Sequence, residues 1–133
     1  NVADKIHFKY CDYRDITGKY DAIVSVEMLE AVGEAWWPSY FDKVASCLVQ
    51  GGKAAIQTIT IANHRFADYS RNTDFIQQYI FPGGMLPSPD KLYQLSKQAH
   101  LTVTDYLSKF GVFISGIAKQ ALSANVPVFV SSY

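Results

Sequence analysis

The sequence between residues 20 and 33 reads Tyr-Asp-Ala-Ile-Val-Ser-Val-Glu-Met-Leu-Glu-Ala-Val-Gly, and it decides the fold class. Its apolar run, Ala22 to Val26, has the length and the β-branched residues of a strand buried on both faces. The run ends abruptly at Glu27, and a second carboxylate, Glu30, follows on the next turn. In open α/β sheets, ligands bind at the carboxyl ends of the parallel strands. We therefore expect a functional site where this strand ends.

Other segments also have the pattern of strands. Ile6–Cys11 and Leu101–Leu107 alternate apolar and polar residues, and Lys53–Ile61 is rich in β-branched residues. Val126–Val130 is a candidate edge strand, because an edge tolerates the missing donor of Pro127. We expect these segments to extend the sheet.

Helical signals separate the strands. Residues 38–48 begin at a proline and carry a core-facing stripe, and the Gly51-Gly52 pair is expected to end this helix. Residues 89–99 follow Ser88, which suits the N-cap position. The weakest assignments are a short helix at Asp74–Ile80 and an irregular stretch at Asn63–Ser70. The resulting order predicts an α/β fold, a single domain over residues 1–133 with a mostly parallel sheet and flanking helices.

The composition is that of a globular domain. The 133 residues are 49% hydrophobic and 18% charged, and twelve basic residues balance twelve acidic ones. Nucleic-acid binding relies on an excess of Lys and Arg, so we expect no nucleic-acid partner. No apolar run approaches the roughly 20 residues that span a bilayer, and we expect a cytoplasmic protein.

The potential metal ligands are scattered. His7, His64 and His100 stand far from one another and from other ligand types, so we expect no metal site. Cys11 and Cys47 lack metal-ligand spacing and are expected to be reduced, buried thiols.

The glycines never form a phosphate-binding motif. Neither G-x-G-x-x-G nor G-x-x-x-x-G-K occurs. The helix N-terminus that follows such a turn supplies many contacts to a nucleotide. If the fold is one that binds a nucleotide, as the family resemblance described below implies, we therefore expect this chain alone to hold half of the site, to bind the cofactor weakly and to be inactive by itself.

Two groups of residues have the chemistry of a site. Glu27 and Glu30 would share one helical face and could act as a general base or hold a cation; alternatively, they are solvated charges. Asp12-Tyr13-Arg14 follows another expected strand. The carboxylate could accept from an exocyclic amine while the tyrosine lies on a purine face; alternatively, the segment is a turn with an Asx hydrogen bond.

Two apolar stretches remain. Residues 81–88 are rich in turn formers, and they form either a lid over an apolar pocket or a connector between helices. Residues 36–41, Trp-Trp-Pro-Ser-Tyr-Phe, are expected to be core rather than a lipid-docking surface.

Four signatures occur in the order and spacing of a known family: Asp12-Tyr13-Arg14-Asp15, Ile23 to Gly33, Gln57-Thr58-Ile59, and Tyr79 to Ser88. Together they resemble the cyclopropane-fatty-acyl-phospholipid synthase family, which includes the mycolic acid cyclopropane synthases. The resemblance covers residues 4–111, and residues 112–133 read as a divergent tail.

The resemblance implies the C-terminal half of a Rossmann-like class I methyltransferase domain that uses S-adenosyl-L-methionine. In that family the methyl group passes to a cis double bond of a phospholipid acyl chain. A bound bicarbonate then takes a proton from the carbocation, and the ring closes. A cationic intermediate of this kind needs a nearby anion and an apolar pocket that excludes water.

The resemblance also implies roles for individual residues, carried over position by position. Glu30, Gln57 and the backbone of Ile59 would form the bicarbonate site, with Gln57 donating where relatives often have His. Asp12, Tyr13, Arg14 and Glu27 would border the cofactor. The acyl channel would be walled by Phe81, Pro82, Gly83, Gly84 and Leu86.

The family implies a peripheral phospholipid bilayer partner at the inner membrane face. Open sheet edges would favour self-association. Two alternatives stay open at this point. One is a methyltransferase of the same fold that acts on a small amine, a sterol or another lipid. The other is a non-catalytic module that binds lipid or a protein partner.

Overall fold

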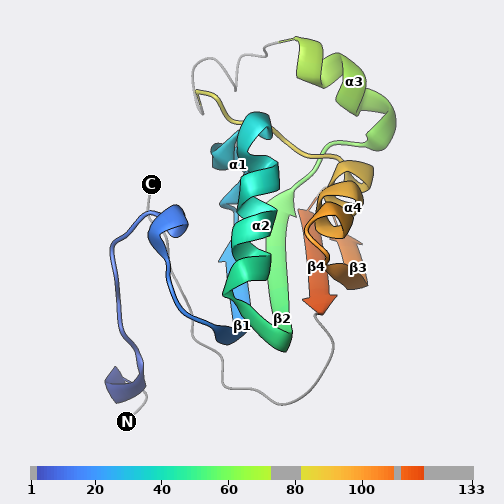
Figure 1. Cartoon of the computed structure of the whole chain (residues 1–133). Coiled ribbons are helices and arrows are strands. Elements are labelled where there is room, and N and C mark those ends of the chain that lie inside the picture. Colours follow the sequence, from blue (N-terminus) through green and yellow to red (C-terminus); the bar gives the residue numbers. More distant parts are fainter. Residues whose placement is uncertain (1–2, 73–81, 110–111, 119–133) are drawn as a thin grey trace.

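The computed structural model describes residues 3–72, 82–109 and 112–118 (Figure 1). Its elements, in chain order, are η1 (Ala3–Lys5), η2 (Tyr13–Asp15), β1 (Tyr20–Val26), α1 (Leu29–Val32), η3 (Glu34–Trp36), α2 (Trp37–Cys47), β2 (Leu48–Ile59), α3 (Asn63–Arg71), α4 (Pro89–Gln98), β3 (Thr102–Lys109) and β4 (Val112–Ala118). The expected strands and helices near residues 22–26, 38–48, 53–61, 89–99 and 101–107 are confirmed.

The sheet has the order β1-β2-β4-β3. β1 and β2 pair in parallel, whereas β4 is antiparallel to both of its neighbours. β1, β2 and β3 therefore run in one direction, and β4 alone is reversed. In this arrangement β1 and β2 end side by side, with Val26 opposite Gln57.

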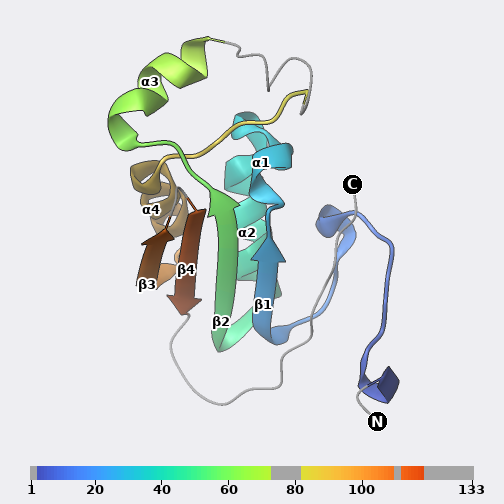
Figure 2. The same ribbon diagram turned by 180° about the vertical axis from the view of Figure 1, so that it is seen from behind.

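The helices of the described residues gather on one face and at one end of this sheet. α2 and α4 lie across the same face, and Figure 2 shows the opposite face without a covering helix. α1 and α3 lie beyond the carboxyl ends of β1 and β2 (Figure 1). The α/β class expected from the sequence is confirmed. α1 and α3 cover the end of the sheet where the functional site was expected (Figure 1).

The core forms where α2 and α4 meet the sheet. It is built from buried apolar side chains: Leu29, Trp37, Tyr40, Phe41, Val44, Leu48, Ala54, Ile56, Met85, Leu92, Leu95, Ala99 and Leu101. The helical stripe of α2 supplies the three aromatic rings among these. Of the two tryptophans expected in the core, Trp37 is fully buried, but Trp36 is 57% exposed.

The prediction of a strand at Ile6–Cys11 is wrong. These residues belong to no helix or strand, and Phe8 and Tyr10 are 85% and 89% exposed. A strand exists only when a neighbour completes its hydrogen-bond ladder, and no strand of the described residues lies beside this segment. The alternation of apolar and polar residues was therefore not enough to form a strand here.

The glycine pair was also misassigned. α2 ends at Cys47, and Gly51-Gly52 lies inside β2, where the register shifts between Tyr20 and Ala22 of β1. Gly51 has a φ of 84°. A Cβ on Gly52 would lie 3.1 Å from the carbonyl oxygens of both Tyr20 and Asp21. The pair therefore permits a bulge against the neighbouring strand and does not cap the helix.

Residues 63–70, expected to be irregular, form most of α3. Phe66 and Tyr69 lie one helical turn apart and pack against the core, and the Phe66 ring lies 6.4 Å from that of Trp37. This single apolar pair was too short a signal within a polar stretch. The expected helix at Asp74–Ile80 and edge strand at Val126–Val130 lie outside the described residues.

Candidate functional site

The carboxyl ends of β1 and β2 are joined by backbone and side-chain bonds. The backbone N–H of Glu27 donates to the carbonyl of Gln57 at 2.9 Å. The side-chain Nε2 of Gln57 donates to Oε1 of Glu27 at 3.3 Å. Glu27 takes a φ of 49°, in the left-handed region that few residues other than glycine adopt. The turn out of β1 is therefore fixed to the end of β2.

Glu30, in the first turn of α1, lies against the same end of β2. One carboxylate oxygen accepts a hydrogen bond from the backbone N–H of Ile59. The other, Oε2, is buried and has no hydrogen-bond partner in the described part of the chain. A buried carboxylate oxygen without a donor is costly, and such atoms call for an explanation. This oxygen is a ready acceptor for a ligand that carries an O–H or N–H group.

Bonds from both sides hold α1 in place. Leu29 is fully buried, and its carbonyl accepts from Nε1 of the buried Trp37 at 3.1 Å. The carbonyl of Glu30 accepts from the backbone N–H of Met85 at 2.8 Å. The core and a loop that is distant in sequence therefore hold α1, and with it Glu30, in place.

That loop, residues 82–88, runs between α1 and α3 (Figure 1). Besides the Met85 bond, the N–H of Leu86 donates to the hydroxyl of Tyr69 at 3.4 Å, and the carbonyl of Pro87 accepts from Ile61 at 3.0 Å. Of the residues predicted to wall an acyl channel, Pro82 and Gly83 are exposed, Gly84 and Leu86 are half-buried, and Phe81 lies outside the described residues. Their channel role stays a prediction.

The Asp12–Arg14 segment forms an Asx turn at the start of η2. Oδ1 of Asp12 accepts from the backbone N–H of Arg14 at 2.9 Å. The guanidinium of Arg14 also donates to both carboxylate oxygens, at 2.9 and 2.6 Å. The hydrogen bonds from Arg14 lower the pKa of Asp12 from 3.8 to about 2, and they raise the pKa of Arg14 above its ordinary value. The turn geometry weighed as an alternative is the one observed.

Tyr13, between the two exposed residues of this ion pair, is half-buried. Partial burial raises the pKa of its phenol, and its ring meets that of Tyr40 edge-on at 5.8 Å. Tyr13 lines a mainly apolar pocket of about 200 Å³ between η2, β1 and α2. Ser25, on the wall of this pocket, has a buried hydroxyl with no hydrogen-bond partner in the described residues.

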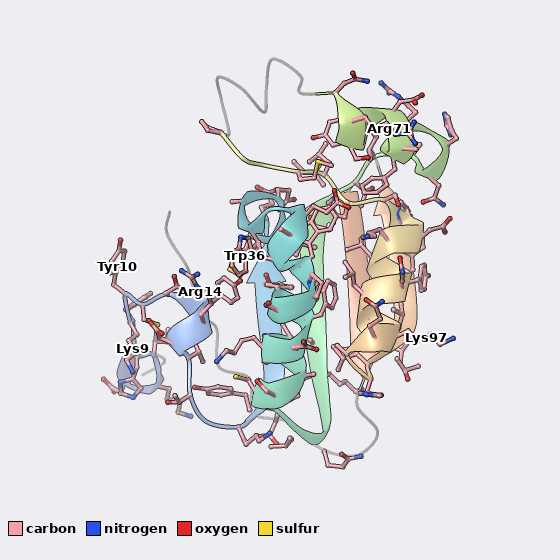
Figure 3. The ribbon with its side chains drawn as sticks, turned by 45° about the horizontal axis from the view of Figure 1, so that its top comes forward. Lys9, Tyr10, Arg14, Trp36, Arg71 and Lys97 are labelled. Carbon is pink, nitrogen blue, oxygen red and sulfur yellow. The ribbon has the colours of Figure 1, made fainter. Side chains whose placement is uncertain are left out.

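The structure therefore divides the sequence-predicted residues into two places. Glu27, Glu30, Gln57 and Ile59 come together at the carboxyl ends of β1 and β2, but none of them lines the pocket. The other place is the flank outside β1, where Figure 3 shows Arg14 together with Lys9 and Tyr10.

Sequence reasoning missed two residues that hold the site together. The hydroxyl of Tyr69 accepts from Leu86 of the loop, 17 residues further along the chain. The backbone N–H of Met85 donates to the carbonyl of Glu30 in α1. The only sequence signal for Tyr69 was its spacing from Phe66. Met85 acts through its backbone, which no sequence pattern reports.

The described residues offer neither a cluster of metal ligands nor a helix that could cross a membrane. No group of three or more His, Cys, Asp or Glu side chains in residues 3–72, 82–109 and 112–118 could hold a metal ion. Within the same ranges, every helix is too short or too polar to traverse a lipid bilayer.

Known proteins resemble the chain in sequence. It is 45% identical over 94 residues to the tuberculostearic acid methyltransferase UfaA1 of Mycobacterium tuberculosis, covering 71% of this chain and 22% of that protein. It is 36% identical over 100 residues to the cyclopropane-fatty-acyl-phospholipid synthase of Escherichia coli, covering 71% and 24%. The chain thus spans about a quarter of the length of these relatives.

Solved structures and a family model add to this. The mycolic acid cyclopropane synthase CmaA1, solved with SAH and CTAB, matches with a TM-score of 0.64 and 25% identity, over 74% of this chain and 38% of that one. An O-methyltransferase family protein from Burkholderia thailandensis shares the fold, with a TM-score of 0.71 at 17% identity over 90% and 37%. The model of the mycolic acid cyclopropane synthetase family matches residues 1–114, so the chain belongs to that family.

Proposed function

We propose that these residues form part of a methyltransferase that uses S-adenosyl-L-methionine to add one carbon to the cis double bond of phospholipid acyl chains. The observation that carries the proposal is the carboxylate of Glu30, which is bonded to Ile59 on one side and has a buried, unpartnered oxygen on the other. It lies at the carboxyl ends of parallel strands, where ligands of open α/β sheets bind. Family membership and the relative of Escherichia coli support the same class of reaction.

The unpartnered acceptor at this edge suits the O–H group of a bicarbonate ion. A bicarbonate ion carries one O–H group, and Oε2 of Glu30 is an acceptor without a donor. The N–H of Ile59 is already bonded to Glu30, so its part is to orient the carboxylate. Bicarbonate would supply the base that removes a proton from the reacting carbon.

Of the proposed cofactor residues, Asp12, Tyr13 and Arg14 lie on the flank outside β1, beside the pocket that Tyr13 lines. S-adenosyl-L-methionine would supply the methyl group, and the structure of CmaA1 with SAH supports this assignment. Tyr13 offers an aromatic face at the pocket, while Asp12 keeps acceptor capacity beyond its bonds to Arg14. These residues would bind the cofactor, and Glu30 would face the reacting carbon.

A second product is favoured by a specific comparison. Identity to the tuberculostearic acid methyltransferase is 45%, against 36% for the cyclopropane-fatty-acyl-phospholipid synthase. A methyl branch, formed when the carbocation loses a proton from the acyl chain and keeps a double bond in place of closing a ring, is therefore the alternative product. In either case the substrate would be a lipid in a bilayer, which the protein would meet peripherally at the inner membrane face.

The proposal is tested in cells that express the natural gene containing these codons and are fed methionine labelled with ¹³C in its methyl group. We expect phospholipid acyl chains that gain one labelled carbon, and NMR of these lipids separates ring protons from those of a methyl branch. The Glu30→Gln variant should lose the product. The matched control is Glu34→Gln, because Glu34 is a surface carboxylate 3.6 Å from Lys91. Wild-type cells without labelled lipid, or an active Glu30→Gln variant, would contradict the proposal.

A further inference from the structure

Glu27 and Gln57 form a pair that joins the ends of β1 and β2 through backbone and side-chain hydrogen bonds. Val26 is opposite Gln57 in the ladder, so the residue after β1 reaches the end of β2. Backbone and side chain both bond across this gap, at 2.9 Å and 3.3 Å. The side chains of Glu27 and Gln57 are thus joined directly, beside a backbone bond between the same residues.

The backbone of Glu27 is held in a conformation that disfavours its residue type. Its φ of 49° places a side chain with a Cβ where glycine is the usual choice. Such conformations persist only where the surroundings enforce them, and they gather at functional sites. Here the conformation turns the chain out of β1 and brings the carboxylate of Glu27 to the amide of Gln57.

The chemistry of the pair fixes which end of the amide faces Glu27. An ionised carboxylate only accepts hydrogen bonds, and the amide of glutamine has a donor nitrogen and an acceptor oxygen. The nitrogen of Gln57 must therefore face Glu27, and its carbonyl oxygen must face away from it.

We propose that Glu27 is a positioning residue that orients the amide of Gln57, so that Oε1 of Gln57 faces the reaction site as an acceptor. The inference rests on the function proposed above and deepens it. Oε1 of Gln57 would then present an acceptor to the carbon on which positive charge develops, beside the bicarbonate that Glu30 would hold. Preorganised dipoles of this sign stabilise such a charge. The role differs from the donor role that the family resemblance implied for Gln57.

The test follows the side-chain NH₂ signals of Gln57 by ¹⁵N NMR in the 133-residue chain, identified by their absence in Gln57→Ala. Acid is added until Glu27 is protonated. We expect the Gln57 signals to shift during this titration and the shift to disappear in Glu27→Gly, a residue that suits a φ of 49°. The control Glu34→Gln should keep the wild-type titration. Gln57 signals that are identical in wild type and Glu27→Gly throughout the titration would overturn the proposal.

A second readout separates positioning from cofactor contact. In enzyme made from the natural gene, Glu27→Gly should lower kcat by up to about 100-fold, the lower end of the loss when one preorganised group is removed, with an unchanged KM for S-adenosyl-L-methionine. A raised KM with an unchanged kcat would overturn the positioning role. The NMR titration does not depend on lipid product. If wild-type enzyme forms no product, the proposed function fails, while the Glu27–Gln57 geometry is still judged by the NMR result.

Discussion

The carboxyl end of the sheet and the flank outside β1 both carry predicted site residues, yet they are held in opposite ways. At the sheet end, Glu30 bonds to Ile59 across 29 residues of sequence, over the buried side chains of Leu29 and Trp37. On the flank, Asp12 bonds to Arg14 two residues away, beside the exposed Tyr10. The first arrangement depends on the tertiary fold, whereas the second is local. Substitutions should therefore act very differently in the two regions.

The largest difference is expected from removing one aromatic ring in each region. Trp37→Ala deletes a fully buried ring and its bond to Leu29, and it should lower the free energy of unfolding by about 3–5 kcal/mol. Tyr10→Ala removes an 89% exposed ring and should change it by less than about 0.5 kcal/mol. Urea denaturation of both variants measures this, and equal losses would show that the regions are not distinct.

A smaller effect is expected where β1 and β2 set their register. In Gly52→Ala the new Cβ would meet two carbonyl oxygens of β1 at 3.1 Å and Leu48 at 3.0 Å. We expect a loss of roughly 1–3 kcal/mol, because backbone atoms cannot move aside. The control is Gly83→Ala, with a φ of 80° but open space around it, which should cost about 1–2 kcal/mol from backbone strain alone. A Gly52→Ala variant as stable as wild type would mean that the bulge adapts and does not fix the register.

The smallest effect concerns pH on the flank. The pKa of Asp12 is lowered from 3.8 to about 2 in the folded chain, so its ion pair with Arg14 contributes stability above pH 3.8. That contribution is lost as the pH falls through about 2. Wild type should therefore lose slightly more stability than Asp12→Asn over this acid range, measured by thermal denaturation at each pH. Parallel curves for the two proteins would show that the exposed pair contributes nothing.

The sequence predicted the part of the site that follows from strand ends. The apolar run before Glu27 and the β-branched run before Ile59 placed two strand ends in the sequence, and parallel pairing brings such ends together. The Asx turn at Asp12 was also foreseeable as an alternative, because it needs only neighbouring residues. Both predictions rest on information that is close in sequence.

The remaining features depend on contacts that no local pattern reports. Ile6–Cys11 alternates like a strand, but a ladder requires a neighbour. The Gly51-Gly52 pair looked like a helix end because its proximity to β1 was not visible in the sequence. The left-handed conformation of Glu27 and the bond from Met85 to Glu30 are likewise set by tertiary packing.

The central claim is that the carboxylate of Glu30 is held by the N–H of Ile59 at the carboxyl end of the sheet. The most direct test is the amide proton shift of Ile59 in ¹⁵N NMR, followed as acid protonates Glu30, in wild type and in Glu30→Ala. We predict a strongly downfield signal that moves upfield with acid and starts upfield in Glu30→Ala. An Ile59 signal that is the same in both proteins and does not respond to pH would contradict the account.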